Sequence, residues 1–140
     1  MKSIFIDTNI LIDFISLREP FGEAALQLFK LCENKKIELS TSSHAIATSH
    51  YILRKKYSEA DVRSTLQDAL EFLNVISVTE SIVKKALRSV HKDFEDAIQI
   101  YCAHTVENVF AIVTRDVRHF STSDIKVYAP DEVLELLKKN

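Results

Sequence analysis

Glycine and proline are scarce in this sequence, with one glycine and two prolines among 140 residues. A chain with so few turn-forming residues is expected to have short connections between its helices and strands. Hydrophobic residues make up 46% of the sequence and charged residues 27%. These proportions are typical of a soluble domain rich in helix, and they exclude disordered and fibrous proteins. The length fits one core, so we expect a single domain over residues 1–140.

The sequence also lacks long apolar runs and an excess of either charge. No run reaches the length needed to cross a bilayer, and the first residues do not show the pattern of a signal peptide. We therefore expect a cytoplasmic protein with no membrane contact. The formal net charge is only −2. Any contact with nucleic acid must then come from a local basic patch.

Cysteine is nearly absent as well, with only Cys32 and Cys102 present. Both lie among apolar residues at helical spacing, far from the paired-cysteine patterns of zinc sites. Buried free thiols are therefore favoured over a disulfide.

Short β-branched runs alternate along the chain with longer stretches of helical periodicity. The expected strands are Ile4–Ile6, Val75–Val78, Val109–Val113 and Lys126–Tyr128, with a weaker one at Ile37–Leu39. Helical patterns begin at Pro20, Ser58, Thr79 and Pro130, and further helices are expected after Asp7 and Asp93 and around Thr48. This alternation predicts an α/β fold, a three-layer α/β/α sandwich with a mostly parallel sheet of about five strands.

The helical patterns also assign side chains to the core. The expected buried stripes are Ala25, Leu28, Phe29 and Cys32 in the helix that Pro20 opens; Val62, Leu66, Ala69, Leu70 and Leu73 after Ser58; Ile82, Val83, Ala86, Leu87 and Val90 after Thr79; and Phe94, Ala97, Ile98 and Tyr101 after Asp93.

Acidic residues stand where the predicted strands end or the helices begin. They are Asp7 after the first strand, Asp116 after the fourth, and Asp93, Glu95 and Asp96 at the start of the intervening helix. Ligands of parallel α/β sheets bind beyond the carboxyl ends of the strands. We therefore expect these carboxylates to meet at one crevice.

Carboxylates gathered in one pocket repel one another unless a cation neutralises them. Ligation by oxygen alone, without histidine or cysteine at metal-binding spacing, favours Mg²⁺ or Mn²⁺ over Zn²⁺. Such an ion activates a water and stabilises negative charge on a phosphate. The residues therefore predict metal-assisted hydrolysis of a phosphodiester.

Each carboxylate also has a purely structural interpretation. Asp7 and Asp93 suit the N-caps of the helices that follow them, and Asp116 suits a turn. Asp13, which shares a helix face with Asn9, is expected to be solvated surface. The functional interpretation is favoured because the three acidic sites fall on the same predicted edge of the sheet.

Three segments, FIDTNILID, DFEDAIQIYCA and IVTRDVRHF, resemble in order the motifs of the PIN domain, the nuclease fold of VapC-type toxins. The resemblance runs from Ile4 to about Pro130. It implies a metal-dependent endoribonuclease in which Asp7, Asp96 and Asp116 bind Mg²⁺ or Mn²⁺. It further implies RNA as the substrate, an antitoxin protein as a possible partner, and a homodimer.

The resemblance extends to neighbouring polar residues. Asp93 matches a further acidic position of the catalytic pocket, and Asn9 and Thr114 match positions that orient a ligand, water or substrate phosphate. Among the basic residues, Arg115 and Arg118 flank Asp116 and are best placed to contact a phosphate. For His119, a packing role is favoured over a catalytic one.

One position departs from the PIN pattern. PIN nucleases commonly carry an acidic residue in the segment that here reads SSHAIATSHYILRK, and the matching residue is Thr48. A hydroxyl is a poorer Mg²⁺ ligand than a carboxylate. The first alternative is therefore a weakened or inactive PIN-like module that binds RNA or a protein partner. A second is a phosphatase of the haloacid dehalogenase type, which requires an aspartate where this chain has Asn9.

Overall fold

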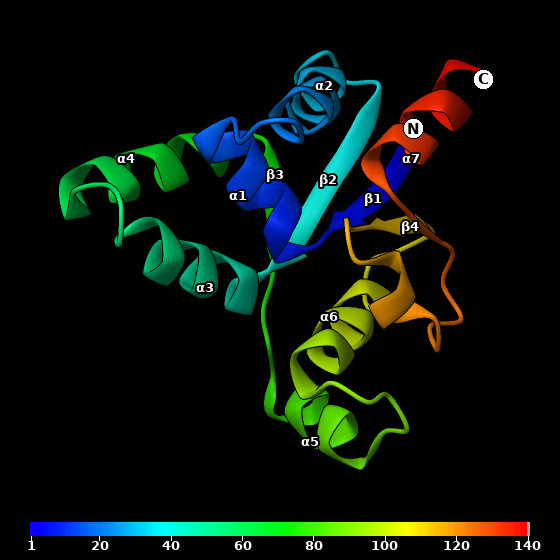
Figure 1. The fold of residues 1–140 in the computed structure, drawn as a ribbon. Helices are drawn as coiled ribbons and strands as arrows, with labels where there is room; N and C mark the ends of the chain where they lie inside the picture. The colour runs from blue at the N-terminus through cyan, green and yellow to red at the C-terminus, as the bar shows by residue number, and fades with distance from the viewer. Residues whose placement is uncertain (140) are drawn as a thin grey trace.

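The computed structural model describes residues 1–139, which fold around a five-stranded sheet (Figure 1). The strands are β1 (Lys2–Ile6), β2 (Ile37–Ser42), β3 (Leu73–Ile76), β4 (Val109–Val113) and β5 (Val127–Tyr128). Their spatial order is β3-β2-β1-β4-β5, and every pairing is parallel. The predicted parallel sheet is confirmed, although β3 begins two residues earlier than expected and β2 extends three residues further.

Helices cover both faces of the sheet. They are α1 (Thr8–Ser16), α2 (Gly22–Glu33), α3 (Ser43–Leu53), α4 (Glu59–Ala69), α5 (Glu80–Arg88), α6 (Phe94–His104) and α7 (Pro130–Lys138), with a 3₁₀ turn, η1, at Val117–Phe120. Alternation along β1 assigns Ile4 and Ile6 to the core beneath α1, α2, α4 and α7, and Phe5 to the core beneath α5 and α6. This arrangement confirms the three-layer α/β/α sandwich.

Several of the expected buried side chains are exposed. Helix α4 ends at Ala69, so Leu70 is exposed and Leu73 belongs to β3 rather than to the helix. Helix α5 buries only Ile82 and Ala86; Leu87 is 69% exposed although it lies within the helix, and Val90, beyond the helix end at Arg88, is 86% exposed. At Leu70, Leu73 and Val90 the predicted stripes are wrong because each helix ends before the apolar pattern does.

Phe94 and Pro20 also differ from expectation. Phe94 is the first residue of α6 and is exposed, because the helix turns its apolar face to the core only from Ala97 onward. Pro20 lies before α2 rather than in its first turn. The carbonyl of Arg18 accepts hydrogen bonds from the N–H groups of Phe21 and Gly22, which closes a turn ahead of the helix.

The single glycine and the two cysteines have clear structural places. A Cβ atom on Gly22 would lie 2.6 Å from the carbonyl carbon of Leu17, so the close approach of α2 to the end of α1 requires glycine. Both cysteines are free, as predicted; Cys102 is buried and Cys32 is half-buried. No helix within residues 1–139 is long and apolar enough to cross a membrane.

The strand order creates one reversal in the sheet. The chain builds outward from β1 through β2 to β3, then returns to the other side of β1 with β4 and β5. The crevice between the carboxyl ends of β1 and β4 is therefore the point where neighbouring connections diverge, which is the usual ligand site of an open α/β sheet.

Candidate active site

Asp7 stands at this crevice, at the junction of β1 and α1. It is the N-cap of α1, and its Oδ1 accepts a hydrogen bond from the Thr8 N–H at 2.8 Å. The same oxygen accepts from Gln99 Nε2 at 3.0 Å, and Oδ2 accepts from the Thr114 hydroxyl at 2.8 Å. The carboxylate is buried, and three donors from three elements hold its orientation.

Asn9 joins the first and fourth strand ends. Its Nδ2 donates to Thr114 Oγ1 and to Asp116 Oδ2, each at 3.3 Å, and its Oδ1 accepts from the N–H of Arg115. The Thr114 hydroxyl also accepts from the N–H of Asp116 at 3.0 Å. Because Thr114 is fully buried, it positions Asp7 and the following loop rather than facing the crevice.

Asp96 brings a third carboxylate to the same place from the first turn of α6. Its pKa is raised to about 6, first by burial and then by repulsion from Asp93, Asp7 and Asp116, while His119 acts in the opposite direction. A carboxyl with its pKa raised in this way lies in an environment of concentrated negative charge.

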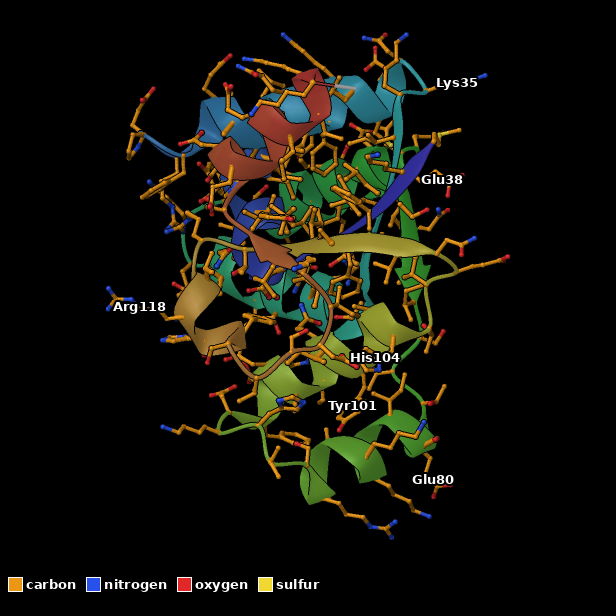
Figure 2. All side chains as sticks on the ribbon, turned by 90° about the vertical axis from the view of Figure 1, so that its right-hand side faces the viewer. Lys35, Glu38, Glu80, Tyr101, His104 and Arg118 are labelled. Atoms are coloured by element: carbon orange, nitrogen blue, oxygen red, sulfur yellow. The ribbon has the colours of Figure 1, made fainter. Side chains whose placement is uncertain are left out.

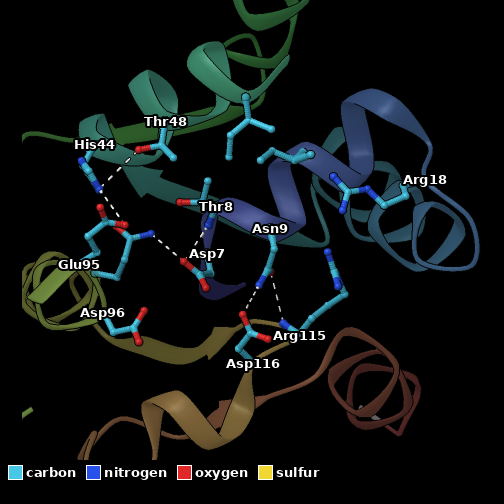
Figure 3. Close-up of a pocket in the computed structure, with 13 residues that line it drawn as sticks. Asp7, Thr8, Asn9, Arg18, His44, Thr48, Glu95, Asp96, Arg115 and Asp116 are labelled. Atoms are coloured by element: carbon cyan, nitrogen blue, oxygen red, sulfur yellow. Dashed lines mark hydrogen bonds and ion pairs between the residues drawn. The ribbon is translucent and has the colours of Figure 1, made fainter. Parts of the chain in front are cut away.

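The three aspartates line one cavity of about 430 Å³ (Figure 3). Its lining consists of Asp7, Thr8, Asn9, Ile12, Arg18, His44, Thr48, Ile52, Glu95, Asp96, Gln99, Arg115 and Asp116. Four carboxylates therefore face two guanidinium groups and one imidazole. Thr48 does line the cavity, at the α3 side, as the sequence comparison with the PIN pattern implied.

Other predicted site residues lie differently. Asp93 is the N-cap of α6, with its Oδ1 accepting from the Asp96 N–H at 2.9 Å, and it does not line the cavity. Its charge nevertheless reaches Asp96. Arg118 projects from the surface (Figure 2) and is likewise outside the lining. His119 is exposed, and Phe120 beside it is buried.

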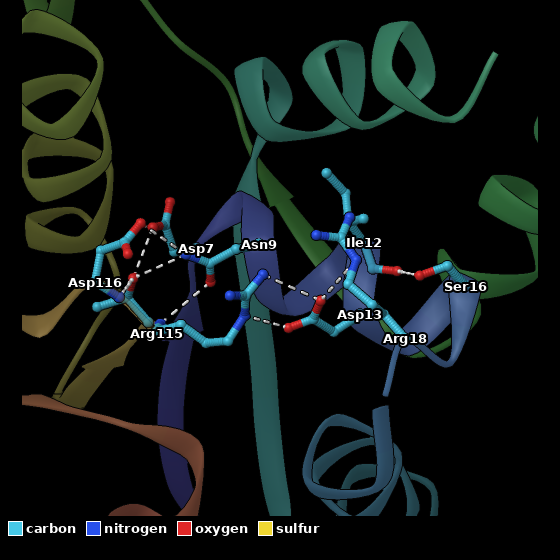
Figure 4. Close-up of polar contacts among 9 residues, drawn as sticks. Asp7, Asn9, Ile12, Asp13, Ser16, Arg18, Arg115 and Asp116 are labelled. Carbon is cyan, nitrogen blue, oxygen red and sulfur yellow. Dashed lines mark hydrogen bonds and ion pairs between the residues drawn. The ribbon is translucent and has the colours of Figure 1, made fainter. Parts of the chain in front are cut away.

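Asp13 is the clearest correction, because it is fully buried instead of solvated. Arg115 Nε lies 2.6 Å from Asp13 Oδ2, Arg115 Nη2 lies 3.3 Å from Oδ1, and Arg18 Nε lies 3.8 Å from Oδ1 (Figure 4). The guanidinium of Arg115 also lies over the Phe21 ring, 4.0 Å from its centroid. A buried carboxylate requires such partners.

Sequence reasoning did not identify Gln99, His44 and Arg18, which all line the cavity. Gln99 donates to Asp7 and accepts from the Ser42 hydroxyl, which caps α3. It therefore joins α6 to the ends of β1 and β2. His44 Nε2 lies 3.8 Å from Glu95 and 3.5 Å from the Thr48 hydroxyl. Arg18 lies in the turn after α1. Of these, only Gln99 carried a sequence signal, as a polar residue within the apolar pattern of α6.

The chemistry of the donor set fits a hard divalent cation, since carboxylates dominate the cavity and repel one another. Within residues 1–139, no three histidine, cysteine, aspartate or glutamate side chains are close enough to hold an ion together. An ion that keeps part of its water shell, as Mg²⁺ readily does, needs fewer direct protein ligands. The assignment of Asp7, Asp96 and Asp116 as ligands stays a prediction.

Comparisons with known proteins agree with this description. The family model of the PIN domain matches residues 3–118. Ribonuclease VapC1 of Aquifex aeolicus is 28% identical over 142 residues, which cover 96% of this chain and 94% of that protein. A toxin–antitoxin complex from Klebsiella pneumoniae contains a chain that is 25% identical, with a TM-score of 0.65 over 91% of this chain and 97% of that one. VapBC2 of Rickettsia felis, bound to a DNA fragment from its promoter, is 18% identical, with a TM-score of 0.64 over 91% of this chain and 98% of that one.

The sheet order and the acidic crevice define an open α/β protein with its ligand site at the switch point. The family match is more specific: this chain belongs to the PIN domain family. The membership agrees with the resemblance of the three motifs and excludes the haloacid dehalogenase alternative.

Proposed function

We propose that this chain is an endoribonuclease that hydrolyses RNA phosphodiester bonds with the help of Mg²⁺ or Mn²⁺. The observation that carries the proposal is the shared cavity of Asp7, Asp96 and Asp116, which come from three separate parts of the sequence. Burial, together with repulsion from Asp93, Asp7 and Asp116, raises the pKa of Asp96 to about 6. The ribonuclease name of a relative that is similar over nearly the whole chain supports the same activity.

In this proposal, Asp7, Asp96 and Asp116 hold the ion. A bound divalent ion supplies stabilisation of negative charge on the phosphate and lowers the pKa of a water. Gln99 and Thr114 each donate to one oxygen of Asp7, and Asn9 donates to Oδ2 of Asp116. Such fixed donors keep the carboxylates oriented without reorganisation during the reaction. Arg18 and Arg115 bring positive charge to the cavity that a phosphate would enter.

Replacing Asp7 with asparagine tests the activity. The amide keeps the size of the side chain but removes the charge, so metal-dependent RNA cleavage should fall by at least about 100-fold, equivalent to several kcal/mol of transition-state stabilisation. Cleavage of a labelled RNA in Mn²⁺ provides the measurement, and circular dichroism checks the fold. The matched control is Asp68→Asn, on the exposed surface of α4 outside the cavity. An undiminished cleavage rate for Asp7→Asn would refute the assignment.

A second candidate is a PIN-family module that binds RNA or a protein without cleaving RNA. Two observations favour it: Thr48 lines the cavity where a carboxylate is common in the family, and residues 1–139 contain no preformed group of three metal-binding side chains. Isothermal titration with Mn²⁺ separates the candidates, because absence of binding at millimolar concentrations supports the second.

We also propose that the chain is the toxin of a toxin–antitoxin pair and that it forms a homodimer. The similarity to a chain in a solved toxin–antitoxin complex supports the first part of this proposal. Co-expression with the protein encoded by a neighbouring gene, followed by light scattering of the purified material, tests both parts.

A further inference from the structure

A second hollow, of about 120 Å³, opens beside the acidic cavity and shares Ile12, Arg18 and Ile52 with it. We refer to this second hollow as the α1–α3 groove. Its complete lining is Ile12, Ser16, Arg18, Ile52, Leu53, Lys56 and Tyr57. This lining contains two cations and no carboxylate, whereas four carboxylates line the cavity. The two hollows adjoin at Arg18, and the charged residues of the lining change there from mainly acidic to basic.

The two arginines near Asp13 differ in their freedom to bind a ligand. Arg115 makes two hydrogen bonds to Asp13, stacks on Phe21, and is only 24% exposed. Arg18 approaches Asp13 only to 3.8 Å and is 49% exposed. The charge of Asp13 is thus matched mainly by Arg115 (Figure 4). The Arg18 guanidinium faces the cavity (Figure 3) with most of its donors available.

The far end of the groove carries a cation beside an aromatic ring. Lys56 is exposed and makes no ion pair within residues 1–139. Tyr57 follows it and is 40% exposed while lining the groove. Cations that follow the backbone, together with aromatic rings on which bases stack, are the general means of holding single-stranded nucleic acid.

We propose that the α1–α3 groove is a subsite for single-stranded RNA beside the scissile phosphate, an inference that rests on the proposed nuclease function. Arg18 binds the first phosphate outside the cavity, Lys56 binds a phosphate further along the strand, and Tyr57 stacks on a base. A polyanion entering a cavity of four carboxylates needs compensating charge next to it, and the groove supplies that charge. Two cations and an aromatic ring in a lining without carboxylates favour single-stranded RNA over a protein segment, because a nucleic-acid strand brings both regularly spaced phosphates and bases that stack.

Binding of RNA to the intact chain tests the subsite. The probe is a fluorescein-labelled single-stranded RNA of about 12 nucleotides, measured by fluorescence anisotropy in EDTA so that metal-dependent cleavage cannot occur. Each phosphate contact on a single strand contributes about 0.7 to the slope of log K against log salt. Arg18→Gln and Lys56→Gln should each reduce that slope by about 0.7, and the double variant by about 1.4.

The matched control is Lys55→Gln. It removes the same charge one residue away, but the Lys55 ammonium lies over the Tyr51 ring, 4.9 Å from its centroid, and lines neither hollow. Its slope should equal that of the wild type. Tyr57→Leu keeps an apolar side chain and should weaken binding about tenfold through lost stacking. Tyr51→Leu, an exposed tyrosine outside the groove, should not.

Wild-type salt slopes for Arg18→Gln and Lys56→Gln would overturn the subsite, and so would failure of the wild-type chain to bind the RNA. Loss of binding to a protein partner alone, with RNA binding unchanged, would also overturn it and assign the groove to that partner. Lys56→Gln changes only an exposed side chain, so its result does not depend on folding. Because the assay needs no cleavage, failure of the nuclease proposal leaves its outcome interpretable.

Discussion

At the scale of single residues, aspartates in this chain serve different physical purposes. Asp7 caps α1 and accepts hydrogen bonds from three donors, whereas Asp13 is buried and forms an ion pair with Arg115. Asp96 is half-buried near other carboxylates, and its pKa rises because burial and their repulsion outweigh the opposing effect of His119. The arrangement around Asp96 lowers the stability of the fold, as functional sites often do.

Replacing Asp96 with asparagine should therefore stabilise the metal-free protein at high pH. Because the pKa of Asp96 in the folded chain, about 6, exceeds its ordinary value of 3.8, its favourable contribution is complete below pH 3.8 and is lost as the pH rises through 6. With solvent screening taken into account, Asp96→Asn should gain about 1 kcal/mol at pH 8.

Urea unfolding in EDTA at pH 8 and at pH 4 measures this gain, which should shrink at the lower pH. Asp68→Asn, on the surface of α4, provides the control. Equal stability of Asp96→Asn and the wild type at pH 8 would mean that neither burial nor repulsion from neighbouring carboxylates appreciably disfavours the ionised Asp96 side chain.

At the scale of helices and strands, the acidic cavity depends on a few connections between elements. Helix α6 packs Ala97, Ile98 and Ile100 into the core and directs Asp96 and Gln99 to the cavity. Helix α5 covers α6 from outside and buries Ile82 and Ala86 in the same cluster as the apolar side chains of α6. The apolar pattern of α5 therefore overstates how much of the helix is buried.

Two alanine substitutions on α5 measure this difference. Ile82→Ala should cost about 3 kcal/mol of unfolding free energy, because a buried side chain is lost and a cavity remains. Leu87→Ala should change stability by no more than about 0.5 kcal/mol, because that side chain is already in contact with water. Guanidinium unfolding of both variants gives the comparison, and a cost for Leu87→Ala as large as that for Ile82→Ala would contradict the exposure of Leu87.

At the scale of the whole molecule, the sheet order brings the ends of β1 and β4 together and α6 beside them. Folding therefore brings the repelling carboxylates of the crevice together, and an ion bound there should stabilise the entire chain. Membership of the PIN domain family is consistent with this use of the switch point.

Addition of Mn²⁺ should raise the melting temperature of the wild type. At a concentration about 100 times the dissociation constant, the gain in unfolding free energy is about 2.7 kcal/mol. Asp7→Asn should show a much smaller shift, and NaCl at matched ionic strength controls for general screening. Equal melting curves in Mn²⁺ and in NaCl would favour the non-catalytic module.

Much of the fold could be predicted, because strands and helices of this chain follow local periodicity. Some of the errors fell where an apolar pattern outlasts its element, as at Leu73 and Val90. For the cavity, Asp7, Asp96 and Asp116 were predicted from their places at element ends. Arg18 and His44 were not, because nothing in the order of residues shows which surface side chains face a crevice.

The sequence by itself determined the alternating α/β pattern and the placing of acidic residues at strand ends and helix starts, because both depend on spacing along the chain. Only the tertiary structure decided what those residues touch. Asp13 is buried because Arg115, 102 residues later, returns beside it, and Asp7 is oriented by Gln99, 92 residues away. Contacts over such separations depend on how the sheet is ordered, and local periodicity carries no information about that order.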